Sequence, residues 1–368
     1  MTVDSIELEN FRNYSCEKAE LSPGINVITG ENAQGKTNLL EAVFMLSCGH
    51  GFRTRFDKEL IAFDEGFARI KSSVSACERK QDIEILLAAG KRKQISINGV
   101  KKTAGELSEL TRVVLFCPDD LGMIKAGAAE RRRFINMAVC QLRPQYATLL
   151  GEYTRLYEHK LRILKDWHEK PSLLDTLDEF SDCMCRISAK MIRYRAAFAK
   201  RLSETAEPIH REFSGNGEEL SVQYRTVSSV LDPFAPDTVL YEQICRHQSA
   251  HREAEIASGC ILTGVHKDEL EIEINGVSAR LFASQGQTRT AALSLKMAER
   301  EISMAETGEN PVLLLDDVLS ELDSKRQEFV LNRIGGGQTL ITCCEDEEIR
   351  KRTGGRVITV KDGHILQQ

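Results

Sequence analysis

The sequence lacks the features that mark membrane-spanning or secreted proteins. No apolar run approaches the about 20 residues that a membrane-spanning helix needs, and the best candidate stretches lie at 39–46 and 312–315. Asp4, Glu7 and Glu9 stand in an alternating pattern near the start, which is typical of a strand and not of a secretory signal. We therefore expect a cytoplasmic protein.

No Cys-x-x-Cys spacing occurs among the eleven cysteines, so no common zinc or redox motif is indicated. Cys183 and Cys185 would point to different sides of a helix, and Cys343 and Cys344 are adjacent, so neither pair makes an obvious metal clamp. We expect reduced thiols, as is usual in the cytosol.

An excess of positive charge is also missing, because the formal net charge is −6 at pH 7. A general basic coat for nucleic acid is therefore excluded, and any such partner has to be held by local patches. With 42% hydrophobic and 28% charged residues, the composition is otherwise ordinary for a globular protein.

Hydrophobic periodicity indicates strands at both ends of the chain and helices in the middle. Strands are expected around 6–14, 25–28, 83–87 and 95–97, with a helix from Lys36 onward. The dipeptides Asn98-Gly99 and Asn275-Gly276 each predict a hairpin turn. The final third alternates between helices and strands, which predicts an α/β fold with a mixed or parallel sheet; its helices are expected at 287–306 and 325–334, and its strands at 312–315, 338–342, 357–360 and 364–366.

The middle of the chain predicts an inserted helical hairpin. Two apolar stripes, at 146–168 and from 177 to about Pro208, flank Pro171, and each helix would be about 40 Å long at 1.5 Å per residue. A polar stretch at 214–237 would then lead back to β structure.

The segment 30–37 fits the phosphate-binding pattern GxxxxGK[ST] between a strand and a helix. Backbone amides of its glycine-rich turn can cradle phosphate, aided by the helix N-terminus. Lys36 would bridge the β- and γ-phosphates, and the Thr37 hydroxyl would bind Mg²⁺. The predicted ATP-binding residues of this loop are Gly30, Glu31, Asn32, Ala33, Gln34, Gly35, Lys36 and Thr37.

Two aspartates follow the apolar strand at 312–315, at the strand end where α/β sheets place their ligands. Asp316 would hold the Mg²⁺ ion, and Asp317 would orient the attacking water. With Lys36 they form the predicted catalytic group of an ATPase.

A Ser-x-Gly-Gln turn at 284–287 lies ahead of this strand and opens a helix. Ser284, Gly286 and Gln287 could present a hydroxyl and amides to a γ-phosphate, although the same four residues could be a plain helix cap. Ser320-Glu321-Leu322-Asp323 follows the strand directly.

The order GENAQGKTN, SQGQ, LLLDD, SELD resembles the ABC-type heads of the SMC, Rad50 and RecF group. Further stretches look like the RecF family in particular, over nearly the whole chain. They read LENFRNY, GFRTRFDKELIAF, FCPDDLGMIKAGAAERRRF, QLRPQY, VHKDELEIEING and SQGQTRTAALSLKMAE.

The resemblance implies an ATP-bound homodimer, in which each nucleotide lies between the 30–37 loop of one subunit and the 284–287 turn of the other. Such a dimer would clamp single-stranded and gapped or duplex DNA and release it after slow hydrolysis. It would act with RecR and RecO in recombinase loading and in the SOS response. The ATP-binding head would comprise 1–115 and 258–368, with a helical lid or arm at 116–257.

Several residues depart from the patterns of related heads. Asp317 stands where transporter-type heads have glutamate, and its shorter reach predicts slow turnover. No histidine follows the strand at 338–342, where many ABC heads contact the γ-phosphate, which leaves Thr342 as a substitute beside Cys343 and Cys344. Val265 and Lys267 stand where the family leads us to expect proline and arginine.

The basic clusters allow more than one interpretation. Arg131, Arg132 and Arg133 could bind DNA phosphates or pair with nearby carboxylates. Arg53 and Arg55 could reach nucleotide or DNA, and His266 could be a ligand contact or a structural histidine. The alternative functions are an SMC-like structural DNA ATPase and, with less support, a transporter nucleotide-binding subunit.

Overall fold

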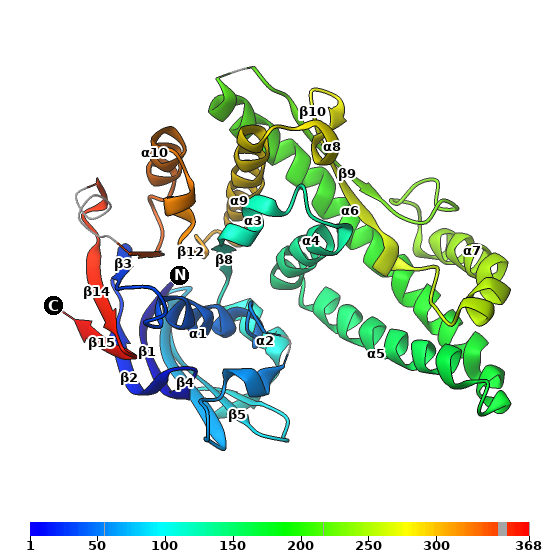
Figure 1. Ribbon diagram of the computed structural model, residues 1–368, viewed down its shortest axis with the longest axis horizontal. Coiled ribbons are helices and arrows are strands. Elements are labelled where there is room, and N and C mark those ends of the chain that lie inside the picture. Colours follow the sequence, from blue (N-terminus) through cyan, green and yellow to red (C-terminus); the bar gives the residue numbers. More distant parts are fainter. Residues whose placement is uncertain (55, 216, 345–351, 368) are drawn as a thin grey trace. The chain divides into compact units, whose positions relative to one another are not determined.

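The computed structural model describes residues 1–54, 56–215, 217–344 and 352–367, which form two compact units (Figure 1). Unit 1 comprises Met1–Gly122 and Leu295–Gln368, and unit 2 comprises Met123–Ser294. The predicted boundaries at 116 and 257 differ from these. The segment 258–294 belongs to unit 2 because its strand β10 (Glu269–Ile274) pairs with β9 (Leu220–Arg225).

Unit 1 contains an antiparallel six-stranded sheet in the order β2-β1-β4-β5-β6-β7. Its burial alternates along β4 and the second half of β5, as expected for a sheet with one covered face. The Asn98-Gly99 turn between β6 and β7 is confirmed, with both residues at positive φ. The strands are β1 Thr2–Phe11, β2 Tyr14–Glu20, β4 Phe67–Ala76, β5 Arg79–Ala88, β6 Gln94–Ile97 and β7 Val100–Lys102.

The second sheet of unit 1 has the order β15-β14-β3-β13-β12-β8 and is parallel except for β15. Strands β8 and β12 are buried at every position, which is why they appear in the sequence as unbroken apolar runs. Because β3, β13 and β12 are parallel, the residues that follow them meet at one edge. The strands are β3 Ile25–Thr29, β8 Val113–Phe116, β12 Val312–Leu315, β13 Thr339–Cys343, β14 Arg356–Lys361 and β15 His364–Gln367.

Short helices join the strands of unit 1, and a longer one begins in unit 2. The apolar helix α1 (Lys36–Cys48) is almost entirely buried, as a helix between two sheets must be. Helix α9 (Gln285–Thr307) begins in unit 2 and ends in unit 1. The others are α2 Ala104–Leu110, α3 Pro118–Gly122, α10 Ser324–Arg333, and the 3-10 turns Asp57–Leu60 and Val318–Glu321.

Unit 2 is built on a helical hairpin, as predicted, with α5 and α6 side by side (Figure 1). Helix α6 passes through Pro208, so the predicted end there was wrong. Ile209 and Phe213 are buried and continue the apolar stripe of α6. Their burial stabilises the helix by more than the hydrogen bond that Pro208 cannot donate. The 22-residue helix α7 was not predicted. The helices are α4 Ala128–Leu142, α5 Pro144–Asp166, α6 Leu177–Ser214, α7 Asp237–Ser258 and α8 Ala279–Phe282, with 3-10 turns at Pro171–Thr176 and Val265–Lys267.

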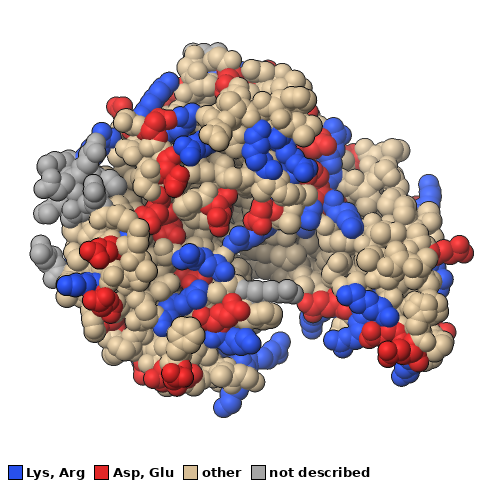
Figure 2. All heavy atoms as spheres, in the orientation of Figure 1, with Lys and Arg blue, Asp and Glu red and all other residues tan. Residues whose placement is uncertain are grey.

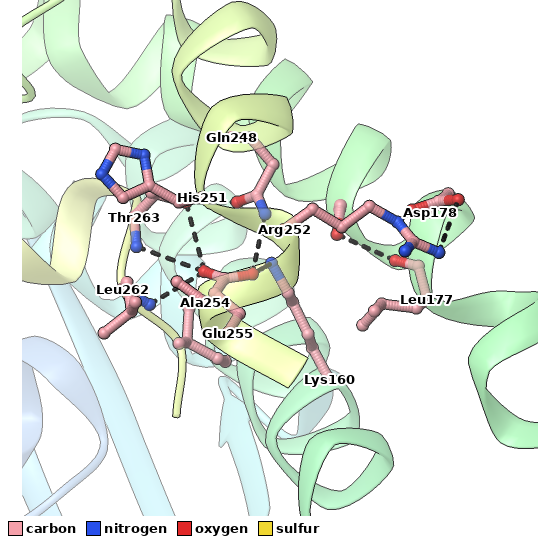
Figure 3. Close-up of polar contacts among 12 residues, drawn as sticks. Lys160, Leu177, Asp178, Gln248, His251, Arg252, Ala254, Glu255, Leu262 and Thr263 are labelled. Atoms are coloured by element: carbon pink, nitrogen blue, oxygen red, sulfur yellow. Dashed lines mark hydrogen bonds and ion pairs between the residues drawn. The ribbon is translucent and has the colours of Figure 1, made fainter. Parts of the chain in front are cut away.

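A buried ion pair ties α7 to the hairpin (Figure 3). Lys160 Nζ lies 2.7 Å from Glu255 Oε2, and both side chains are fully buried. The other carboxylate oxygen accepts the backbone N–H groups of Leu262 and Thr263, while Gln248 donates to Oε2. Both carboxylate oxygens therefore have polar partners, which a buried carboxylate requires.

A three-stranded sheet, β11-β10-β9, completes unit 2, with β11 at Val277–Ser278. The predicted Asn275-Gly276 turn joins β10 to β11, again with both residues at positive φ. In the part of the chain that the structure describes, no helix has the length and apolar character needed to cross a bilayer.

Candidate nucleotide-binding site

The loop between β3 and α1 has the geometry of a phosphate cradle. Gly30 and Gly35 have φ angles of 149° and 120°, which non-glycine residues rarely adopt. A Cβ on Gly30 would collide with the Val360 carbonyl, and one on Gly35 would lie 2.7 Å from Asn13 Nδ2. Both positions therefore require glycine, and the loop can turn its backbone toward a ligand at the start of α1.

Lys36 is buried to 4% exposure, and its ammonium group lies within this loop. Nζ donates to the Gly30 carbonyl at 2.6 Å and to the Glu31 carbonyl at 3.0 Å. The positive charge of Lys36 is thus held against the backbone at the start of the loop. A phosphate group entering the loop would meet both this charge and the N-terminal amides of α1.

Two residues of the first hairpin brace the loop from outside. Tyr14 donates its hydroxyl to the Gly35 carbonyl at 2.9 Å, and Asn13 Nδ2 donates to the Gln34 carbonyl at 2.8 Å. Asn38 on α1 donates to Asn13 Oδ1 at 2.8 Å. The loop is therefore fixed by side chains far from it in the sequence, which suits a site that has to be preorganised.

A further brace joins the hairpin to α1 and to the segment after it. Arg12 donates from two nitrogens to the Glu41 carboxylate, at 2.7 and 3.0 Å. The Arg53 backbone N–H donates to the other oxygen of the fully buried Glu41 at 3.1 Å. The Arg53 side chain is exposed, and Arg55 lies outside the described residues.

Thr37, Asp316 and Thr342 bring three oxygens together at the shared strand edge. Thr37 Oγ1 lies 2.8 Å from Asp316 Oδ1, and Thr342 Oγ1 lies 3.0 Å from the same oxygen. Burial raises the pKa of Asp316 above its usual range, whereas hydrogen bonds from both threonines oppose that rise. A hydroxyl and a carboxylate at this spacing are the hard oxygen donors that suit Mg²⁺ beside a phosphate.

Asp317 has a left-handed backbone, with φ 52°, directly after the buried strand. Its N–H donates to Thr342 Oγ1 at 2.8 Å, and its carbonyl accepts the Ser320 hydroxyl at 2.6 Å. A non-glycine residue in this region costs about 1 kcal/mol or more and marks a position held by its surroundings. Asp317 is thus fixed in a turn beside Asp316.

The Ser284–Gln287 turn is a capping box at the start of α9 in unit 2, with Ser284 and Gln285 exposed and Gly286 and Gln287 half-buried. Ser284 Oγ accepts the Gln287 N–H at 3.2 Å, and Gln287 Oε1 accepts the Ser284 N–H at 2.8 Å. Gln287 also donates to Glu218 at 2.8 Å. The turn thus caps α9, and its exposed serine lies at the surface, where a partner can reach it.

The three consecutive arginines have different surroundings. Arg131 is 3% exposed and binds Glu269 and the carbonyls of the 123–126 turn, so it is left out of any DNA-binding surface. Arg132 donates to the Asp268 carbonyl, and exposed Arg133 pairs with Glu130 at 3.5 Å. On the face in Figure 2, lysine and arginine lie among acidic side chains. On that face the basic groups are therefore local and do not form one broad basic field.

The fold and the site together define an ABC-type ATPase head with a helical insertion, as predicted. The profile of the RecF/RecN/SMC N-terminal domain matches residues 2–364. The DNA replication and repair protein RecF of Acetivibrio thermocellus is 40% identical over 96% of each chain. The chain belongs to the RecF family.

Solved structures agree with this assignment. The structure of the recombination mediator protein RecF-ATPrS in the RecFOR pathway is 32% identical, covers 100% of this chain and 98% of its own, and has a TM-score of 0.91. The Smc head domain from Pyrococcus furiosus is 16% identical, with coverages of 100% and 96% and a TM-score of 0.55, and shares the fold alone.

Sequence reasoning assigned no role to Asn13, Tyr14 or Glu41, although these residues shape the loop. The motif pattern marks residues adjacent in sequence, whereas these contacts join the β1–β2 hairpin to the phosphate loop and to α1. The buried glutamate inside the apolar helix was the one available signal, because a fully buried carboxylate needs a partner.

Proposed function

We propose that the protein is an ATP-dependent DNA-binding protein of recombinational repair and replication restart. ATP would be held by the 30–37 loop, with Mg²⁺ between Thr37 and Asp316. The observation that carries this proposal is the convergence of Lys36, Thr37 and Asp316 at one strand edge. The relative whose solved structure is described as RecF-ATP supports the choice of nucleotide.

ATP would drive formation of a homodimer, in which Ser284, Gly286 and Gln287 of one copy face the phosphate loop of the other. The exposed position of Ser284 supports this arrangement. Leu281 and Phe282, just before the turn, are 69% and 71% exposed. Exposed apolar side chains next to a polar anchor are typical of protein interfaces.

Hydrolysis would be slow and would act as a switch that ends the DNA-bound state. Asp317 is held by its backbone beside Asp316, and an aspartate reaches less far than the glutamate of faster ABC heads. Lys36 would stabilise the charge on the transferred phosphate, and Asp317 would position the attacking water. The activity would therefore time the release of DNA.

The dimer would bind DNA at gaps and single-strand/double-strand junctions and would act with RecR and RecO in recombinase loading and the SOS response. The RecFOR pathway named for the solved relative supports this partnership. Exposed Arg53 and Arg133 are the members of the predicted basic set that are best placed for phosphate contacts. Such contacts would be sequence-independent and sensitive to salt.

Ser284→Arg tests the proposed dimer. A large cation at the turn should block the partner's phosphate loop, so that light scattering with ATP and Mg²⁺ shows monomers, while each monomer still binds ATP in calorimetry. Binding to gapped duplex DNA in ATP should weaken with the loss of the dimer. Ser258→Arg adds the same charge to another exposed serine of unit 2 and should leave the dimer intact.

Lys36→Ala separates nucleotide binding from association. It removes the ammonium at the centre of the loop, so ATP binding itself should be lost. A Ser284→Arg protein that still dimerises with ATP contradicts the shared site, and a Lys36→Ala protein that binds ATP as before contradicts the role of the loop.

A further inference from the structure

Helices α6 and α7 of unit 2 pack side by side, and each places a cysteine at their contact (Figure 1). These are Cys185 on α6, which is 3% exposed, and Cys245 on α7, which is half-buried. Both are free thiols, and they are hydrogen-bond partners of each other. Both also line a surface cavity of about 270 Å³, so the pair of sulfurs can be reached from solvent.

Two ion pairs set the register between α6 and α7. Arg252 on α7 lies 2.8 Å from Asp178 on α6 (Figure 3), and Arg193 on α6 lies 2.8 Å from Asp237 on α7. The start of α6 is thus paired with the later part of α7, so the two helices are antiparallel. The same number of residues separates the two pairs on each helix, so the register is constant between them.

This register places the two cysteines opposite each other. Cys185 lies about two helical turns after Asp178, and side chains at that spacing share a helix face. Cys245 lies the same number of residues before Arg252 on α7. The two sulfurs therefore meet across the helix contact, in agreement with the hydrogen bond between them. The thiol pair is thus built into the packing of the helices.

The two thiols differ in their surroundings. Burial, together with the neighbouring Cys245 thiol, raises the pKa of Cys185 above its usual range, so Cys185 stays protonated at neutral pH. Cys245 is more exposed and is the sulfur that a small oxidant entering the cavity meets first. An accessible thiol beside a second, shielded thiol is the arrangement in which a sulfenic acid condenses to a disulfide.

We propose that Cys185 and Cys245 are a peroxide-sensitive modification site that forms a disulfide between α6 and α7. The Cys245 thiolate attacks one oxygen of hydrogen peroxide, the O–O bond breaks, and Cys245 becomes a sulfenic acid while the released hydroxide takes up the thiol proton as water. The Cys185 sulfur then attacks the Cys245 sulfur. The S–S bond forms, the S–O bond breaks, and the hydroxyl group leaves with the Cys185 proton as water. The two thiols lose two electrons in all, and these reduce the peroxide to water.

The disulfide adds a covalent link to a helix contact that the two ion pairs hold only at the surface. The side chains of both pairs are exposed, and exposed ion pairs contribute little to stability. A bond between the two cysteines closes a loop of about 60 residues and restricts the unfolded chain, which stabilises unit 2. The site goes beyond the proposed ATP-dependent function and is independent of it.

Peptide mapping and unfolding measurements test the site. The reduced full-length protein is treated with a small excess of hydrogen peroxide, alkylated with iodoacetamide and digested without reduction. Mass spectrometry should find the Cys185 and Cys245 peptides joined, and dithiothreitol should release them. The equilibrium constant for urea unfolding should fall roughly 30- to 700-fold on oxidation, which is the range of a typical disulfide.

Serine variants separate this pair from the other thiols. Cys245→Ser, at the half-buried position, and Cys185→Ser, at the buried one, should each lose the stability gained on oxidation. Cys183→Ser removes an exposed thiol from the same helix and should keep both the cross-link and the gain, so it is the matched control. The inference is overturned if peroxide leaves the two cysteines unlinked, or if it links Cys183 to Cys245 as readily. Either result leaves the proposed function standing, because light scattering with ATP tests the dimer separately.

Discussion

At the scale of single residues, surroundings decide between roles that the sequence leaves open. His266 accepts the Tyr153 hydroxyl at Nδ1, 2.8 Å away, and its Nε2 lies 3.3 Å from the Ile261 carbonyl. A carbonyl can only accept, so the proton of the neutral ring is on Nε2. Both nitrogens are engaged inside unit 2, which favours the structural interpretation of this histidine.

Burial lowers the pKa of His266 to about 4, from 6.5 in the unfolded chain. The unfolded state therefore binds the proton first as the pH falls, and stability is lost between about pH 6.5 and 4. From pH 7.5 to 5 this histidine should cost about 2 kcal/mol. His266→Gln should remove that part of the pH dependence of urea unfolding, followed by the fluorescence of Trp167, the one tryptophan.

His159→Gln is the control for this measurement, because His159 is exposed on the same helix as Tyr153. It should retain the full pH dependence of the wild type. An equal loss of stability at pH 5 in His266→Gln and the wild type would show that His266 is not the group that titrates.

At the scale of elements, the helices of unit 2 are held by buried polar groups as well as by apolar faces. The α6 guanidinium of Arg195 is 2% exposed and donates to Asp268 and to the Val265 carbonyl, at 2.8 and 2.6 Å. Tyr146 on α5 receives another of its N–H groups at 2.8 Å. These contacts set the register between helices, which the periodicity of an apolar stripe cannot specify.

The Lys160–Glu255 pair allows a test of this principle. Lys160→Met keeps the side-chain volume but leaves a buried carboxylate without its cation, so unfolding should become easier by about 3–5 kcal/mol. Combining it with Glu255→Gln should recover much of that loss, because the amide oxygen can still accept from Leu262. Urea unfolding monitored by Trp167 measures both variants.

Lys165→Met serves as the matched control, since Lys165 is exposed on the same helix. It should change the free energy of unfolding by about 0.5 kcal/mol or less. If Lys160→Met were no more harmful than Lys165→Met, the buried pair would not be what holds α7 to α5.

At the scale of the whole molecule, the proposed function needs surfaces from two copies of the chain. The apolar side chains just before the Ser284–Gln287 turn should contribute to the dimer interface. Leu281→Asp should raise the dissociation constant of the ATP-bound dimer at least about tenfold, because burying a leucine is worth about 1.5–3 kcal/mol and a charge there adds repulsion. Nucleotide binding to the monomer should not change. Light scattering over a dilution series measures the effect.

Leu231→Asp provides the comparison, since Leu231 is 86% exposed on another segment of unit 2. A dimer that is weakened equally by both substitutions would indicate general repulsion and remove Leu281 from the interface. A dimer that is indifferent to both would place the contact elsewhere.

The amino-acid sequence by itself determined the fold class, both hairpin turns and the glycine-rich loop before α1. These features depend on residues that are neighbours in the sequence, such as Asn-Gly at positive φ or a glycine-rich turn before a helix. A short sequence pattern is therefore enough to predict them. The strand before Asp316 was predicted for the same reason, because its four apolar residues are consecutive in the sequence.

Only the tertiary structure decided which distant side chains complete the site. Thr342 and Cys344 reach the aspartates and the loop because parallel strands end at one edge, whereas Tyr14 reaches the loop from the antiparallel sheet. Sequence spacing encodes neither proximity. Burial likewise removed Arg131 from the basic set by pairing it with Glu269. A charged residue shows its type in the sequence, but whether it meets solvent or a partner depends on how the whole chain packs.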